Sequence, residues 1–172
     1  TATVASNALT IGASSQYMDF RSATIGSGAV STITAAPTAL VVPSGATLGT
    51  VAATAARLVI IELLNAGVAE LAIVNANGTV NLDETGLITT TSITTAADSA
   101  DVAYSTSGRT SAPFRVIGYI DITEATAGTW ATAPSTIAAT LSYNSELAVF
   151  SASAGIPQNS QSAAYTTVLA DA

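Results

Sequence analysis

Short apolar or alternating runs recur along the whole chain, and residues typical of turns separate them. Thr and Val are abundant in these runs, and side chains branched at Cβ pack well on a pleated sheet. Several short strands with regular turn signals are typical of an antiparallel sandwich or barrel. The pattern therefore predicts an all-β fold, an antiparallel β-sandwich of jelly-roll-like type.

The expected strands follow from these runs and their flanking turns. The candidate strands are residues 17–20, 29–34, 40–42, 48–51, 57–64, 70–74, 102–104, 113–122, 137–141 and 147–150. A further short segment begins at Val80 and Leu82, and residues 85–99 are expected to be a long loop with one short strand.

The clearest predicted hairpin joins residues 57–64 to residues 70–74 through Asn65-Ala66-Gly67. Residues 55–65 also contain Ala, Arg, Leu and Glu, which favour a helix. The branched run Val59-Ile60-Ile61 and the flanking turns favour the strand, so a strand is the preferred prediction.

Residues 113–122 form the strongest predicted strand. Strict alternation assigns its side chains to two faces. One face carries Phe114, Val116, Gly118 and Ile120, and the other carries Arg115, Ile117, Tyr119 and Asp121.

The chain is expected to hold one domain with two arms. Residues 1–15 and 151–172 are small, polar and aperiodic, so they are predicted to be extended N- and C-terminal arms around a sandwich over residues 16–150. Such arms bind partners or remain flexible. The most apolar run, residues 58–64, is too short for a membrane helix and contains an acid, so no membrane partner is expected.

Charge is scarce. Only 9% of the residues are charged, the net charge is −7, and four Arg supply every basic side chain because Lys and His are absent. Nucleic-acid binding needs clustered basic residues, so nucleic acid is not an expected partner. A surface so poor in charge is expected where other subunits cover much of it.

Catalysis is hard to assemble without Cys, His and Lys. The chain therefore cannot form a Ser–His or Cys–His pair or a lysine Schiff base, and it lacks the usual zinc and haem ligands. No catalytic, cofactor-binding or metal-binding residue is assigned, and no enzyme is expected. Only carboxylates remain. Asp83-Glu84 is best interpreted as a solvated turn, and Asp98 and Asp101 as loop residues rather than a calcium site.

Four residues are candidates for an interface: Trp130, Glu62, Arg57 and Arg115. Glu62 interrupts an apolar run, and an unpaired buried carboxylate is costly. It is expected either to point outward, to pair with Arg57 or Arg115, or to form an ion pair between subunits. Trp130 fits a core plug, a subunit interface or, less well, a platform on which a sugar stacks.

Two series of sequence blocks resemble a known family. The first comprises Asp19-Phe20-Arg21-Ser22, residues 42–51 and Arg57-Leu58-Val59, and the second comprises residues 81–94, 102–121 and 125–137. Together they resemble a domain of tailed-bacteriophage virion proteins and their prophage relatives, described as tail-fibre or phage structural proteins.

This resemblance implies a non-enzymatic, β-rich and commonly oligomeric component of the virion. The short chain with two arms favours a capsid decoration (cement) protein or head fibre. Its expected partners are further copies of itself, as a homotrimer, and the major capsid protein. A tail-fibre or baseplate component remains open, as does a carbohydrate-binding adhesion module whose platform would be Trp130 with Tyr119.

Overall fold

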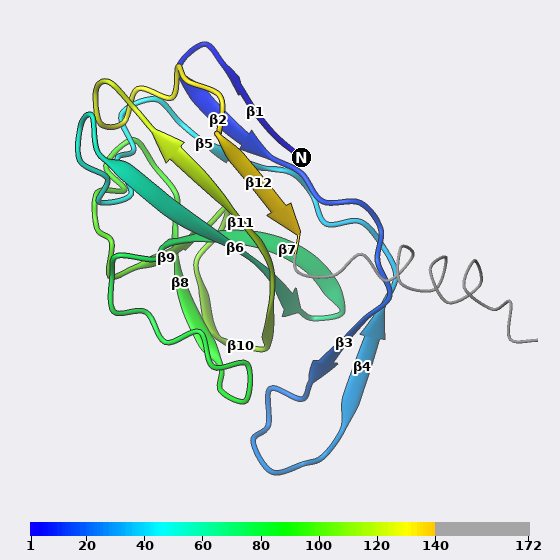
Figure 1. Cartoon of the computed structure of the whole chain (residues 1–172). Coiled ribbons are helices and arrows are strands. Elements are labelled where there is room, and N and C mark those ends of the chain that lie inside the picture. The colour runs from blue at the N-terminus through cyan, green and yellow to red at the C-terminus, as the bar shows by residue number, and fades with distance from the viewer. Residues whose placement is uncertain (140–172) are drawn as a thin grey trace, which may run out of the picture. The chain divides into compact units, whose positions relative to one another are not determined.

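The computed structural model describes residues 1–139, and this part of the chain is all β, with twelve strands and no helix. The predicted strand at 147–150, the end of the one at 137–141 and the predicted arm at 151–172 lie outside the described residues. Figure 1 shows the strands in two larger sheets and one separate hairpin.

The largest sheet has seven strands in the order β10-β8-β9-β7-β6-β11-β12. Its strands are β6 (Ala55–Asn65), β7 (Val68–Asn75), β8 (Ile88–Ser92), β9 (Ala103–Ser105), β10 (Arg109–Ala112), β11 (Phe114–Thr123) and β12 (Thr136–Ala139). The sequence predicted a wholly antiparallel sheet, and this is wrong at one pair, because β8 and β9 are parallel. The connection over residues 93–102 crosses back before β9 begins, which gives both strands the same direction.

A second sheet has three strands in the order β1-β2-β5, namely β1 (Ala2–Ala5), β2 (Ala8–Ile11) and β5 (Leu40–Val42). The expected N-terminal arm over residues 1–15 is therefore mostly a hairpin, in which Leu9 and Ile11 are buried. Its turn, Ser6-Asn7, has positive φ at both residues, as a two-residue turn of type I′ requires. These strands were not predicted, because their alternation of Ala and Thr with larger apolar residues is too weak to mark a buried face.

The third sheet is a two-stranded hairpin of β3 (Met18–Arg21) and β4 (Val30–Ile33), both of which were predicted. Met18 and Phe20 are buried and join the main core. The connecting residues 23–29 are exposed, and Figure 1 shows the hairpin extending away from the larger sheets.

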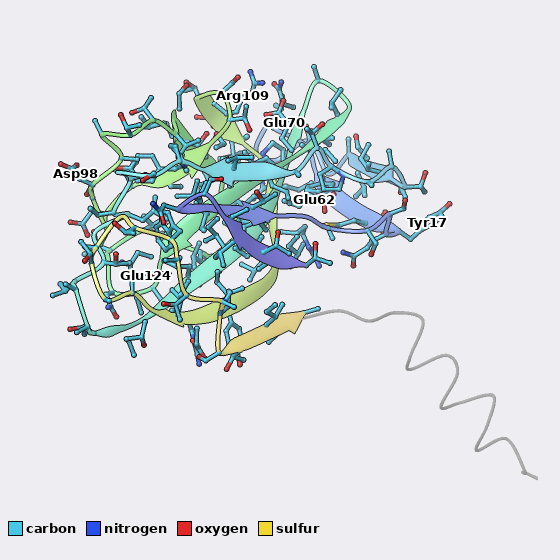
Figure 2. All side chains as sticks on the ribbon, turned by 90° about the horizontal axis from the view of Figure 1, so that it is seen from above. Tyr17, Glu62, Glu70, Asp98, Arg109 and Glu124 are labelled. Carbon is cyan, nitrogen blue, oxygen red and sulfur yellow. The ribbon has the colours of Figure 1, made fainter. Side chains whose placement is uncertain are left out.

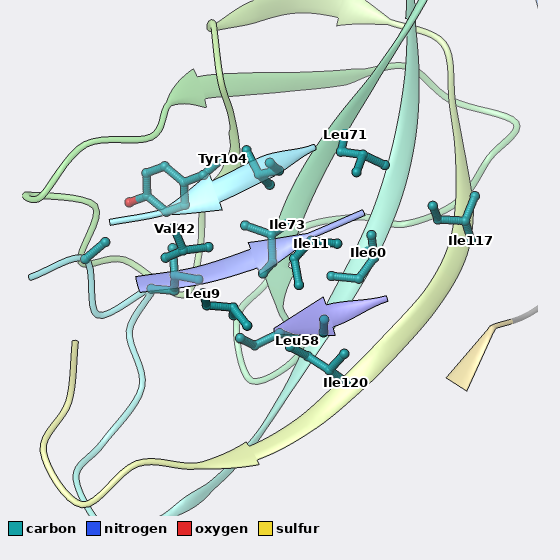
Figure 3. Packing of buried hydrophobic residues seen from close by; sticks show 14 of the residues in the cluster. Leu9, Ile11, Val42, Leu58, Ile60, Leu71, Ile73, Tyr104, Ile117 and Ile120 are labelled. Atoms are coloured by element: carbon teal, nitrogen blue, oxygen red, sulfur yellow. The ribbon is translucent and has the colours of Figure 1, made fainter. Parts of the chain in front are cut away.

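The main hydrophobic core lies between the three-stranded and the seven-stranded sheet. Figure 3 shows Leu9, Ile11 and Val42 facing side chains of the large sheet. The large-sheet side chains labelled there are Leu58, Ile60, Leu71, Ile73, Tyr104, Ile117 and Ile120.

A second cluster covers the opposite face of the large sheet. It contains Ile61, Leu63, Ala72, Val74, Ile88, Ala103 and Phe114. Val80 and Leu82 pack against it although the predicted segment there forms no strand. Both faces of the central strands are therefore covered by apolar side chains.

The predicted hairpin at 57–74 is confirmed, and residues 55–65 form a strand rather than a helix. The predicted alternation along residues 114–121 is wrong at one point. A bulge between Val116 and Gly118 adds a residue opposite β6, so Phe114 packs in the second cluster while Ile120 packs in the first.

Two other differences concern short segments. Residues 48–51 form a turn, because Leu48 has φ 51° and the following Gly49 has φ 70°. Strand β10, which the sequence did not indicate, has the polar sequence RTSA and lies at the edge of the large sheet.

Candidate functional site

Trp130, a candidate for the interface, lies in the core of the chain, where it is fully buried. Its indole Nε1 donates a hydrogen bond to the carbonyl of Ala46 at 3.0 Å, and its backbone N–H donates to the carbonyl of Asn7 at 3.3 Å. A core position was one of the two preferred interpretations. The sugar platform of Trp130 with Tyr119 is not present at the surface of this chain, because the indole is enclosed.

Arg57 lies on the surface of the large sheet opposite Asp121, its direct neighbour across β6 and β11. Its Nε and Nη2 donate to the two carboxylate oxygens of Asp121 at 2.7 and 2.9 Å. The guanidinium also lies 4.0 Å from the ring centroid of Tyr119. Hydrogen bonding to Arg57 lowers the pKa of Asp121, and the same bond raises the pKa of Arg57.

Arg115 lies near Glu84, with 3.1 Å between its Nε and Glu84 Oε2. The contact is an ion pair without hydrogen-bond geometry, because this Nε has no hydrogen-bond acceptor among the described residues. The other oxygen of Glu84 accepts a hydrogen bond from the backbone N–H of Val116 at 2.6 Å. Glu84 therefore binds β11 beside its bulge.

Asp83 has the role expected of a turn residue. Its Oδ1 accepts hydrogen bonds from the backbone N–H and the hydroxyl of Thr85, at 2.9 and 2.7 Å. These bonds lower the pKa of Asp83, with the side-chain bond contributing most. The Asp83-Glu84 pair thus acts in local structure, through one turn and one strand contact.

Glu62 differs most from expectation. It lies on β6 in the interior of the seven-stranded sheet and is only 2% exposed, so it does not point outward (Figure 2). It is not paired with Arg57 or Arg115 in the described part of the chain, because these bind Asp121 and Glu84.

The environment of Glu62 disfavours its ionised form. Burial raises the pKa of Glu62 from 4.5 to about 7, and Oε2 has no hydrogen-bond partner among residues 1–139. Its neighbours across the sheet are Leu71 and Arg115. With a pKa of about 7 this carboxyl is about half protonated at pH 7, and its ionised form lacks a partner that supplies charge or hydrogen bonds to Oε2 among residues 1–139.

Two more acids hold loops and strands within the chain. Glu70 accepts two hydrogen bonds of 2.7 Å from the guanidinium of Arg109. Glu124, which the sequence did not single out, is buried, and its Oε2 accepts from the backbone N–H groups of Ala131 and Thr132. It thereby fixes the loop that carries Trp130.

The candidate calcium residues do not converge. Asp101 Oδ1 accepts hydrogen bonds from the backbone and the hydroxyl of Thr79. Residues 1–139 contain no group of three or more carboxylates that could hold a metal ion. Over the same residues, the chain has no helix long and apolar enough to span a membrane.

Three of the seven large apolar side chains that are exposed within residues 1–139 lie on the β3–β4 hairpin, defined here as residues 17–33. Tyr17 is 78% exposed, Ile25 69% and Val30 63%. Figure 2 shows the Tyr17 side chain pointing away from the body of the domain. This is the same hairpin whose inner face, with Met18 and Phe20, packs on the core.

A groove of about 130 Å³ lies between the end of β2 and the edge of the large sheet. Its floor includes the core residues Ile60, Ile117 and Ile120. Its sides are formed by β12, residues 12–14 and Gln16. None of the residues that line it carries a charged side chain. Within residues 1–139, the hairpin and this groove are two surfaces that an apolar partner could contact.

No protein-family model, no curated protein and no solved structure matches this chain.

Proposed function

We propose that the protein is a non-enzymatic structural component of a bacteriophage virion, a decoration (cement) or head-fibre protein that stabilises the particle through contacts between subunits. The ordered sequence blocks within residues 18–138, which resemble phage structural proteins, support this assignment. So does the charge content of only 9%, because a surface poor in charge is suited to being covered.

The observation that carries the proposal is the β3–β4 hairpin. Three large apolar side chains, Tyr17, Ile25 and Val30, are each more than 60% exposed on it. A two-stranded hairpin gains little stability by itself, and exposed apolar patches mark surfaces that bind other proteins. We assign the outer face of the hairpin to contact with the major capsid protein or another virion protein.

The fold is proposed to be a β-sandwich of jelly-roll-like type. The support is the core shared by the three-stranded and seven-stranded sheets. In this proposal the protein assembles as a homotrimer, and its C-terminal arm, residues 151–172, takes part in the contacts between copies.

The test is to locate the protein on virus particles. Antibody raised against the recombinant chain is applied to particles of the phage or induced prophage that carries the gene, and labelling is viewed by electron microscopy. Label on heads supports a decoration protein. Label on tails alone replaces it with a tail-fibre or baseplate component, and particles without label overturn the proposal.

A matched pair of variants tests the hairpin. The double variant Ile25→Ser with Val30→Thr removes apolar surface from the hairpin, and Val51→Thr with Val68→Thr removes it from other sites of similar exposure. Both are expected to fold, because all four side chains are exposed. Only the hairpin variant is expected to bind particles at least tenfold more weakly than the unaltered chain, and equal loss in both would contradict the assignment.

A further inference from the structure

The groove beside β12 lies between the outer edges of the two sheets. β12 is the last strand of the seven-stranded sheet, and β1 is the first strand of the three-stranded sheet. Among the described residues, no strand pairs with the outer edge of either. Ile137 on β12 is 54% exposed, so this edge presents an apolar side chain. An edge of this kind is a template for an added strand.

We propose that this groove binds residues 147–150 of a second copy of the chain, which add to the outer edge of β12 as an extra strand. The inference rests on the proposed function in one respect, that copies of the chain assemble with one another. It names which segment of one copy binds which surface of the next.

The place where the described chain ends supports this occupant. Ala139 is the last residue of β12 and lines the groove itself. Residues 140–172 continue from it and include the apolar run Leu147-Ala148-Val149-Phe150. Seven residues, 140–146, join Ala139 to Leu147, and at up to about 3.3 Å per extended residue they can span about 23 Å, enough to bring the run to a neighbouring copy.

Charge favours this pairing between copies. Each chain has a net charge of −7, so two copies repel one another wherever charged surfaces meet. The lining of the groove has no charged side chain, and residues 147–170 have none either. The one charge among the lining residues is the α-amino group of Thr1, which is exposed and donates to the carbonyl of Gly12 at 2.7 Å. The segment can therefore bind without desolvating a charged side chain, and strand addition supplies main-chain hydrogen bonds with no need for special side chains.

The test uses engineered disulfides in the full chain, which has no cysteine of its own. One variant carries Ala138→Cys on β12 with Ala148→Cys, and a second carries Ala138→Cys with Val149→Cys, so that either register of the added strand is sampled. Each is oxidised and run on a denaturing gel without reductant. A control combines Ala148→Cys with Thr110→Cys, an exposed position on β10 at the opposite edge of the sheet.

We expect disulfide-linked oligomers in at least one β12 variant and at least tenfold less of them in the control. Mixing chains that carry only Ala138→Cys with chains that carry only Ala148→Cys or only Val149→Cys is expected to give linked pairs. Disulfides formed within single chains would show that the segment folds back on its own groove, which overturns the proposal. Free thiols throughout would overturn it too.

Light scattering on the unaltered chain separates this inference from the proposed function. If the chain forms oligomers but no disulfide links position 138 to the segment, self-assembly is supported and only the groove as its site is rejected. A chain that stays monomeric rejects the groove as a site of self-assembly, while labelling of virus particles still decides the proposed function.

Discussion

The indole Nε1 of Trp130 donates a hydrogen bond to the carbonyl oxygen of Ala46, 84 residues earlier in the chain. Both groups are buried, so neither can exchange this bond for one with water. The bond joins the loop after β11 to the turn after β5. The same loop is held by Glu124, whose carboxylate accepts from the backbone at Ala131 and Thr132.

Replacing Trp130 with Phe should lower the free energy of unfolding by about 2–4 kcal/mol, because it leaves the Ala46 carbonyl unpaired and creates a cavity. Urea unfolding followed by far-ultraviolet circular dichroism measures the change. Tyr17→Phe is the control, and should change stability by less than about 0.5 kcal/mol because Tyr17 is exposed. Equal stability of the two variants would contradict the role of Trp130 in the core.

Glu62 should make the protein less stable as pH rises. Its pKa is about 7 when folded and near 4.5 when unfolded, so the unfolded chain releases this proton first. The stabilisation that protonated Glu62 gives the folded chain is fully present below about pH 4.5. It is lost as the pH rises through about 7. Glu62→Gln should remove this slope and be the more stable protein above pH 7, by up to about 3 kcal/mol.

Urea unfolding at a series of pH values measures this effect. The opposite contribution of Asp83 and Asp121 falls in a separate, acidic range, because their pKa values are lowered and their stabilisation is lost only as pH falls below 3.8. An identical slope in Glu62→Gln and the unaltered chain would show that another group is responsible.

The ion pair of Arg57 with Asp121 should contribute little to stability. The Arg57 side chain is 51% exposed, and water and salt screen such a pair. A double-mutant cycle with Arg57→Ala and Asp121→Ala should give a small favourable coupling that decreases further in high salt. A coupling as large as the effect of Trp130→Phe would contradict this. Arg57→Lys should lose part of it, since Lys cannot form the two-point contact.

Gly118→Ala should displace β12 from β11. A Cβ at this position would lie 2.2 Å from the carbonyl oxygen of Ala138, which is backbone and has to move. We expect a loss of about 1–3 kcal/mol and faster amide exchange over residues 136–139. Thr123→Ala, at the exposed end of the same strand, is the control. Unchanged exchange in Gly118→Ala would show that β12 does not depend on this close approach.

The hairpin of β6 and β7 could be predicted from the sequence, because its local signals agree with one another. Branched residues over 59–61 and a Gly after Ala66 specify two strands and a tight turn, and the structure pairs Asn65 with Val68 around them. The N-terminal hairpin could not, since Ala and Thr alternate too weakly to mark an inner face. Leu9 and Ile11 are buried only because the large sheet covers them.

The candidate interface residues show the same division. The sequence identified Glu62 as a charge that interrupts an apolar run and offered Arg57 and Arg115 as possible partners, but it did not identify the pairs that form. Arg57 pairs with Asp121 because β6 and β11 are neighbours in that register. Glu62 is buried because β6 has a strand on each side and a covered face. Strand order and register are long-range properties, which local pattern does not encode.

The sequence by itself determined the all-β class of residues 1–139, the places of most of their strands and the scarcity of charge, because strand preference, turn chemistry and composition are local properties. Only the tertiary structure decided the parallel pairing of β8 with β9, the bulge between Val116 and Gly118, and the burial of Glu62. It also placed the groove beside β12. The physical reason is that each of these depends on which distant segments pack together, and a one-residue bulge reverses which side chains face the core.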